Sequence, residues 1–129
     1  IQVLKNFNLE KAWVFHSYDG LDEISIFNKT KVYQLENNNI NSFTINPNEF
    51  IKQKFKFEDI VGSDAKYNAQ RILEVFSGKE GALLEIISLN VAASLIVMDR
   101  FDNLEDSYQF SKKYIISGKT FDYYNSIKK

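Results

Sequence analysis

Cysteine is absent from the 129-residue sequence, and histidine occurs once, as His16. Without cysteine the chain can form no disulfide, thiolate nucleophile or zinc–thiolate site, and a single histidine excludes a site built from several imidazoles. Any metal ion held by these residues must therefore have oxygen ligands, which favours magnesium, manganese or calcium.

An excess of charge of either sign is also missing. The sequence has 16 lysine and arginine residues against 17 aspartate and glutamate residues, which gives a formal net charge of −1. This balance provides no electrostatic surface for nucleic acid or for an anionic membrane, so neither is expected as a partner. The closest basic cluster, formed by Lys52, Lys54 and Lys56, fits a solvated strand or loop better than an anion-binding patch.

No hydrophobic run is long enough to span a membrane. The run over residues 82–98 is shorter than the roughly 20 residues that a span needs, and Glu85 and Asn90 interrupt it, so a buried central helix is predicted instead. The chain opens with Ile1 rather than methionine, and we expect it to be a fragment of a longer polypeptide. The absence of cysteine fits a cytoplasmic protein.

Hydrophobic residues make up 44% of the sequence and aromatic residues 15%, which is the composition of a globular domain. The first half predicts a short sheet. Residues 12–16 (AWVFH) are typical of a strand buried on both faces, preceded by the end of a helix over residues 1–8. Residues 30–45 predict two antiparallel strands that turn at Asn37-Asn38-Asn39, and an irregular connector follows.

The second half is predicted to be helical, with helices over about residues 65–77, 82–98, 104–117 and 119–128. Asp64 can cap the first of them, and Gly78 can end it. A strand region followed by helices with short connections is typical of an α/β fold. We expect strands and a loop over about residues 1–60 and helices over about 64–128.

Three carboxylates, those of Asp19, Asp22 and Glu23, follow the first predicted strand directly. We call the segment Asp19–Ser25 (DGLDEIS) the acidic loop. Ligands of open α/β sheets bind just beyond the carboxyl ends of strands, and magnesium is usually held by one or two carboxylates together with substrate phosphates. A solvated acidic turn without any ligand explains the same residues and is the commoner case.

Three segments in the same order resemble the anthranilate phosphoribosyltransferase family: residues 12–25 (AWVFHSYDGLDEIS), 30–35 (TKVYQL) and 61–95 (VGSDAKYNAQRILEVFSGKEGALLEIISLNVAASL). The family shows a strand ending in histidine, an Asp-Gly-x-Asp-Glu loop, a Gly-Gly-Asp-x-x-x-Asn-Ala helix start and a Leu-Asn-Ala helix. The resemblance covers nearly the whole chain. It implies the C-terminal part of an α/β catalytic domain of the nucleoside phosphorylase/phosphoribosyltransferase type, with a short mixed sheet and a helical C-terminal half.

The resemblance also implies an activity. Family members transfer the phosphoribosyl group of phosphoribosyl diphosphate to anthranilate in tryptophan biosynthesis. Asp22 and Glu23 are similar to the family's ligands for Mg²⁺ bound with the diphosphate, and Asp19 and Ser25 are expected to shape the loop. Negative charge builds on the departing diphosphate, where a divalent cation stabilises it, and no covalent protein nucleophile is required. We expect no other catalytic or cofactor-binding residue in this chain.

The sequence departs from the family at three loop positions. Ser17 and Ser63 stand where the family has glycine, and residues 26–29 (IFNK) replace a Pro-Thr-Gly-Pro-like stretch. The family's N-terminal helical domain, with its homodimer contact, and its phosphate-binding and anthranilate-binding segments precede the matched region and are missing from this sequence. We therefore expect the chain to form one wall of a site and to be inactive alone.

Two other interpretations stay open. A non-catalytic module would bind a partner through exposed apolar surface, and a divergent nucleoside phosphorylase-like protein of the same superfamily would act on a nucleoside. Three polar residues are predicted to have structural roles rather than ligand contacts. His16 would support the strand–loop junction, Asn68 a helix cap, and Asn90 a tie between its helix and a neighbouring loop.

Overall fold

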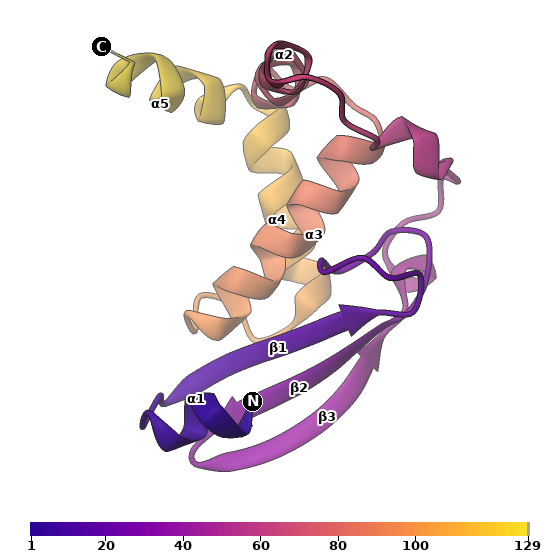
Figure 1. The fold of residues 1–129 in the computed structure, drawn as a ribbon. Coiled ribbons are helices and arrows are strands. Elements are labelled where there is room, and N and C mark those ends of the chain that lie inside the picture. Colours follow the sequence, from indigo (N-terminus) through magenta and orange to yellow (C-terminus); the bar gives the residue numbers. More distant parts are fainter. Residues whose placement is uncertain (129) are drawn as a thin grey trace.

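A computed structural model describes residues 1–128 of the chain. Figure 1 shows a sheet on one side of the molecule and a group of helices on the other, with the N-terminus beside the sheet. A short helix, α1 (Gln2–Asn6), precedes the strands β1 (Lys11–Ser17), β2 (Thr30–Glu36) and β3 (Asn39–Ile45). The predicted order of elements is confirmed for this half.

The three strands form one sheet in the order β1-β2-β3. Phe15 lies opposite Val32, which in turn lies opposite Phe43, so these three apolar residues share one face. Asn37 and Asn38 connect β2 to β3 with φ values of 49° and 61°. Asparagine tolerates this left-handed backbone, which is why the predicted turn forms here.

Two expectations about the sheet differ from the structure. Both strand pairings among the described residues are antiparallel rather than mixed, because residues 18–29 return the chain beside β1 without a crossover helix. Beyond Ala12, the strand β1 is also buried on one face only. Trp13 and Phe15 pack toward the core, whereas Val14 and His16 are exposed on the opposite face, which no helix covers at these positions.

The second half folds into four helices close to the predicted ranges: α2 (Ala65–Phe76), α3 (Ala82–Val97), α4 (Leu104–Ile116) and α5 (Lys119–Ile127). The side chain of Asp64 accepts a hydrogen bond from the amide of Tyr67 at 2.8 Å and caps α2 as expected. The connector before α2 contains two short 3₁₀ helices, η1 (Pro47–Glu49) and η2 (Phe57–Asp59).

The helix α3 is the centre of the fold. It lies between the sheet and α4 in Figure 1, and most of its side chains are buried, which confirms the predicted central helix. None of the helices within residues 1–128 combines the length and hydrophobicity needed to cross a bilayer. The main core joins apolar residues of the acidic loop, the sheet, α3 and α4, among them Ile24, Val32, Ile45, Ile86, Leu89 and Tyr108.

A buried polar group also connects α3 to α4. The carboxylate of Glu85 accepts hydrogen bonds from the Tyr108 hydroxyl and from the Lys112 ammonium, the latter at 2.7 Å. Burial, and then the hydrogen bond to Glu85, raise the pKa of Tyr108 far above its ordinary value, so this phenol stays neutral. These three residues therefore fix how the two helices pack.

Candidate functional site

The acidic loop leaves the end of β1 and passes beside α3 before the chain enters β2 (Figure 1). Its first turn is closed by the backbone. The amide of Gly20 donates to the carbonyl of Ser17 at 3.1 Å, and the amide of Ser17 donates to the carbonyl of Leu21 at 3.1 Å. Gly20 has a φ of 91°, which glycine adopts without strain. The end of the strand therefore leads straight into a tight turn.

Asp19 organises the interior of the acidic loop. Its carboxylate accepts hydrogen bonds from the Leu21 amide at 3.3 Å and from the Ser25 hydroxyl at 2.5 Å. The Ser25 oxygen in turn accepts from the amides of Phe27 at 2.9 Å and Asn28 at 3.3 Å. The prediction that Asp19 and Ser25 shape the loop is confirmed.

The same contacts shift the pKa of Asp19. Partial burial raises it, but hydrogen bonds from the Ser17 and Ser25 hydroxyls and from the Leu21 amide lower it by more, so the pKa lies below its ordinary value of 3.8. Asp19 therefore stabilises the folded loop above pH 3.8, and the contribution is lost as the pH falls through the pKa of the folded state.

We expect the substitution Ser25→Ala to raise the pKa of Asp19 toward 3.8, because the carboxylate loses a hydroxyl donor. An NMR titration of the Asp19 carboxyl carbon measures this shift. The matched control is Ser42→Ala, at an exposed serine of β3 outside the loop, which should leave the titration unchanged. An Asp19 pKa unaltered by Ser25→Ala would contradict the organising role of this hydrogen bond.

The far end of the acidic loop is held by α3 and β2. The amide of Ile24 donates to the Asn90 side-chain oxygen at 2.9 Å, and the Asn90 side-chain nitrogen donates to the carbonyl of Ile24 at 3.0 Å. The next amide, that of Ser25, donates to the Thr30 hydroxyl at 3.1 Å. The predicted tie between Asn90 and a neighbouring loop is confirmed.

Asp22 and Glu23 lie between these two anchored ends, and both side chains are exposed to solvent. No group of three or more histidine, aspartate and glutamate side chains able to share a metal ion occurs within residues 1–128, so a cage made of protein ligands alone is not present in this part of the chain. Two exposed carboxylates do fit the usual way in which Mg²⁺ is bound, with substrate phosphates supplying further ligands.

His16 and Asn68 lie outside this arrangement. His16 is exposed on the outer face of β1, opposite Lys31 of β2. Asn68 accepts a hydrogen bond from the Ser63 amide at 2.9 Å and donates one to the Ser63 carbonyl at 3.1 Å, which confirms its local structural role. A Cβ atom at Gly62 would lie 2.7 Å from the Asn68 side-chain oxygen, so a larger residue there would push the Asn68 amide from its place beside Ser63.

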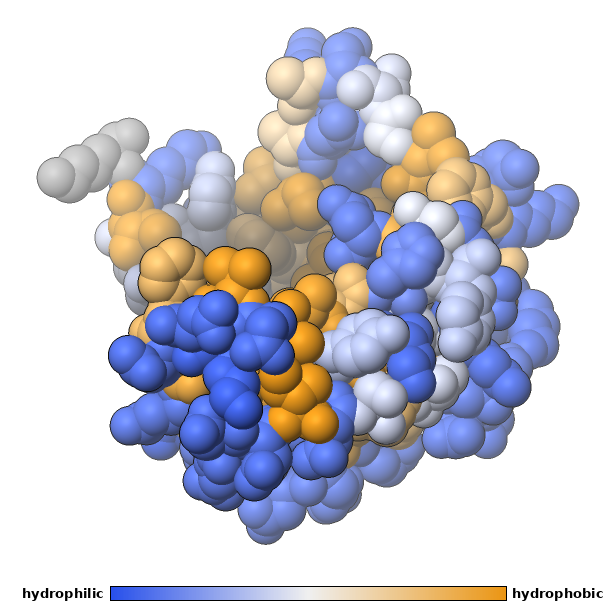
Figure 2. Space-filling view, turned by 60° about the horizontal axis from the view of Figure 1, so that its bottom comes forward, coloured by the Kyte–Doolittle hydropathy of each residue, from blue (hydrophilic) through white to orange (hydrophobic). Residues whose placement is uncertain are grey.

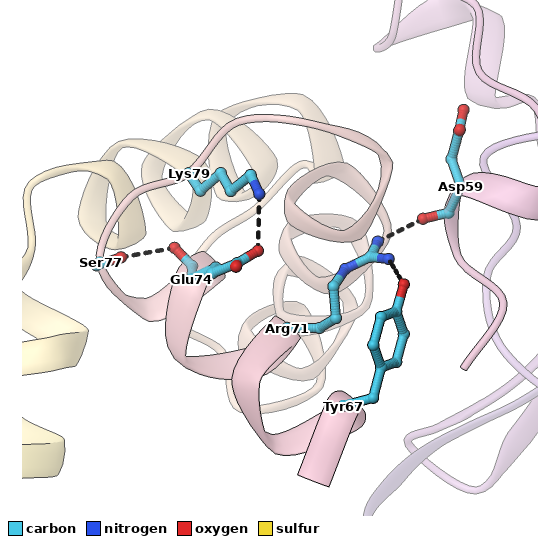
Figure 3. A network of polar contacts seen from close by, with 6 residues as sticks. All are labelled: Asp59, Tyr67, Arg71, Glu74, Ser77 and Lys79. Carbon is cyan, nitrogen blue, oxygen red and sulfur yellow. Dashed lines mark hydrogen bonds and ion pairs between the residues drawn. The ribbon is translucent and has the colours of Figure 1, made fainter. Parts of the chain in front are cut away.

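A second polar network, near the start of α2, was not anticipated from the sequence. Figure 3 shows the Arg71 guanidinium between Tyr67 and Asp59, where it donates to the Tyr67 hydroxyl at 2.7 Å and to the Asp59 carbonyl at 2.6 Å. Lys79 and Glu74 form an ion pair at 2.7 Å beside it. The spacing of Tyr67 and Arg71, four residues apart on one helix, is the only local signal for it. The contact of Arg71 with Asp59 ties α2 to the connector, and the ion pair of Glu74 and Lys79 joins α2 to the segment that follows it.

An apolar groove of about 360 Å³ runs between β1 and α3. Trp13, Phe15, Ala93, Val97 and Met98 line it, and the buried Trp13 side-chain nitrogen has no hydrogen-bond partner among the described residues. On the sheet side of the molecule, Figure 2 shows hydrophobic side chains gathered beside hydrophilic ones and next to a hollow. Exposed apolar surface is the feature expected of a binding module.

Comparison with known proteins supports the resemblance found in the motifs. The model of the family described as "Glycosyl transferase family, a/b domain" matches residues 1–121. The anthranilate phosphoribosyltransferase of Pelagibacter ubique is 39% identical over 119 residues, which are 92% of this chain and 36% of that protein. The chain therefore spans about a third of the length of the curated relative it matches.

Solved structures agree on the fold. The anthranilate phosphoribosyltransferase of Thermus thermophilus superimposes with a TM-score of 0.81 at 17% identity, over 93% of this chain and 35% of that one. The enzyme from Saccharomyces cerevisiae in complex with PRPP and Mg superimposes with a TM-score of 0.74 at 22% identity, over 85% of this chain and 32% of that one. The predicted α/β fold class is confirmed by these superpositions.

Proposed function

The chain belongs to the glycosyl transferase family of the a/b-domain type, and on that premise we propose that it is part of a magnesium-dependent phosphoribosyltransferase. The enzyme would transfer the phosphoribosyl group of phosphoribosyl diphosphate to anthranilate, a step of tryptophan biosynthesis. Residues 1–129 would form one part of its catalytic α/β domain. The N-terminal helical domain, the homodimer contact and the remaining substrate-binding segments would lie elsewhere in the longer protein, in the cytoplasm.

The observation that supports this proposal most directly is the structure of the acidic loop. Asp22 and Glu23 expose two adjacent carboxylates directly after a strand, while hydrogen bonds at Asp19 and Ile24 hold the loop on either side of them. We assign Asp22 and Glu23 as Mg²⁺ ligands. Magnesium bound there with the diphosphate would supply positive charge where the leaving group gains negative charge.

The other residues of the loop would act through position rather than through contact with substrate. The Asp19 carboxylate accepts hydrogen bonds from the Ser25 hydroxyl and the Leu21 amide. It would therefore hold the loop in shape rather than bind the cation. Exposure of Asp22 and Glu23 lets them meet a ligand bound by other segments. The chain thus supplies the metal-binding wall of the site, and the phosphate-binding and anthranilate-binding walls come from the rest of the enzyme.

A direct assay tests the proposal. The purified product of the complete gene, mixed with anthranilate and phosphoribosyl diphosphate, is expected to consume anthranilate only when Mg²⁺ is present, as measured by the loss of anthranilate fluorescence. The isolated 129-residue chain is the matched control and should show no turnover. Turnover by that chain would contradict the proposal that residues 1–129 form only one wall of the active site.

The alternatives correspond to other results of the same experiment. Phosphorolysis of nucleosides in place of anthranilate consumption would favour the phosphorylase-like interpretation. Absence of both activities in the complete gene product would overturn the transferase proposal. It would then favour a binding module, for which the apolar groove lined by Trp13 and Met98 is the supporting observation.

A further inference from the structure

Asn90 lies in the middle of α3 and uses its side-chain amide almost entirely on one loop residue. Its oxygen accepts from the Ile24 amide at 2.9 Å, and its nitrogen donates to the Ile24 carbonyl at 3.0 Å and to the Ile86 carbonyl at 2.9 Å. The two bonds to Ile24 satisfy both backbone groups of that residue. They fix the position of its backbone and also its orientation.

Ile24 is the residue directly after Asp22 and Glu23, so the contact with Asn90 acts at the edge of the proposed metal site. The Ile24 side chain is fully buried in the main core, which anchors the same residue a second time. A polar amide within a largely apolar helix costs free energy unless it is hydrogen-bonded. Here that amide is matched to a loop 66 residues away.

We propose that Asn90 is a positioning residue for the metal-binding loop. The inference rests on the proposed function, because it assumes that Asp22 and Glu23 bind the cation. An anchored loop has already lost the conformational freedom that free carboxylates would lose on binding a metal ion. Groups that orient metal ligands without touching the metal commonly change its affinity 10- to 100-fold when they are removed, and Asn90 has this relation to the loop.

A packing role for Asn90 makes a different prediction from a positioning role. The substitution Asn90→Leu keeps roughly the volume of the side chain and removes its hydrogen bonds, whereas Asn90→Ala removes both. If only packing mattered, the leucine variant would behave like the original chain and the alanine variant would be worse. If the hydrogen bonds to Ile24 matter, both variants lose cation affinity to a similar extent.

The experiment is a titration of the complete enzyme with Mn²⁺ in the presence of inorganic diphosphate, followed by paramagnetic broadening of backbone amide signals in NMR spectra. Broadening should centre on Asp22 and Glu23 and give a dissociation constant. We expect Asn90→Leu and Asn90→Ala to weaken it by roughly 10- to 100-fold. Circular dichroism checks that each variant folds. Because alanine is the best helix former, Asn90→Ala provides the test if Asn90→Leu does not fold.

A matched control separates loop positioning from general loss of stability. Ser107 donates a buried hydrogen bond to the Ala92 carbonyl at 2.9 Å and ties α4 to α3 away from the loop. The substitution Ser107→Ala should leave the dissociation constant unchanged. An unchanged constant in the Asn90 variants would overturn the positioning role.

The metal assignment itself has a separate readout. The double substitution Asp22→Asn with Glu23→Gln should abolish the broadening. If this double variant bound Mn²⁺ like the original chain, the ligand assignment would fail, and with it the premise of the inference. If it lost binding while the Asn90 variants kept it, only the inference about Asn90 would fail. The two failures are therefore distinguishable.

Discussion

Replacing Asp22 with asparagine and Glu23 with glutamine is expected to abolish phosphoribosyl transfer by the complete enzyme without unfolding it. Both side chains are exposed, and the amides have the same shape as the carboxylates, so the loop should keep its structure. The loss of two anionic ligands removes cation stabilisation of the leaving diphosphate, which is worth several kcal/mol. Because each 1.36 kcal/mol changes a rate tenfold, kcat should fall by about 10³-fold or more.

Steady-state assays at saturating Mg²⁺ and substrate measure this effect. The matched control is another consecutive pair of exposed carboxylates, replaced as Glu105→Gln with Asp106→Asn in the first turn of α4. That variant removes the same charge from the chain and should retain turnover close to the original. Turnover of the Asp22 and Glu23 variant within about threefold of the original would refute the assignment of these residues as Mg²⁺ ligands.

The second large effect concerns stability. The substitution Lys112→Met is expected to lower the free energy of unfolding by about 3 kcal/mol, because it leaves the Glu85 charge buried with one partner fewer. The Glu85 side chain is 6% exposed and that of Lys112 is 24% exposed, so the ion pair lies mostly out of water. Partial exposure of the lysine places the expected loss at the lower end of the range for buried pairs. Urea denaturation at pH 7 measures it.

Two comparisons make this result specific. Lys113→Met changes the neighbouring, exposed lysine and should alter the free energy of unfolding by less than about 0.5 kcal/mol. Adding Glu85→Gln to Lys112→Met removes the stranded charge and should recover part of the loss. A Lys112→Met variant as stable as the original chain would show that the ion pair does not hold α3 against α4.

Local sequence signals accounted for most of the elements. Asp64 caps α2, and the asparagine turn forms where these residue types favour it. The segment AWVFH was less informative, because it is apolar on both sides and cannot indicate which face the helices cover. In the structure β1 is an edge strand of the sheet, and Trp13 and Phe15 lie on the face that packs against the core.

The sequence indicates the residues of the candidate site but not the contacts that hold the acidic loop in place. The carboxylates of the acidic loop stand together in the sequence, and the contact of Asn90 with some loop follows from its place in an apolar helix. The partner of Asn90 could not be identified, because Ile24 is 66 residues away and has no polar side chain. The group formed by Glu85, Tyr108 and Lys112 also depends on how two separate helices meet.

The long separation between Ile24 and Asn90 has a consequence for the order of folding. A contact between residues 66 positions apart closes a long loop of chain, and such contacts form later than local turns and helices. The turn at Asp19 depends on near neighbours and can form early, whereas the Ile24 anchor must wait until α3 has docked beside the sheet. The acidic loop therefore acquires its final shape only when the N-terminal and C-terminal halves of the chain have joined.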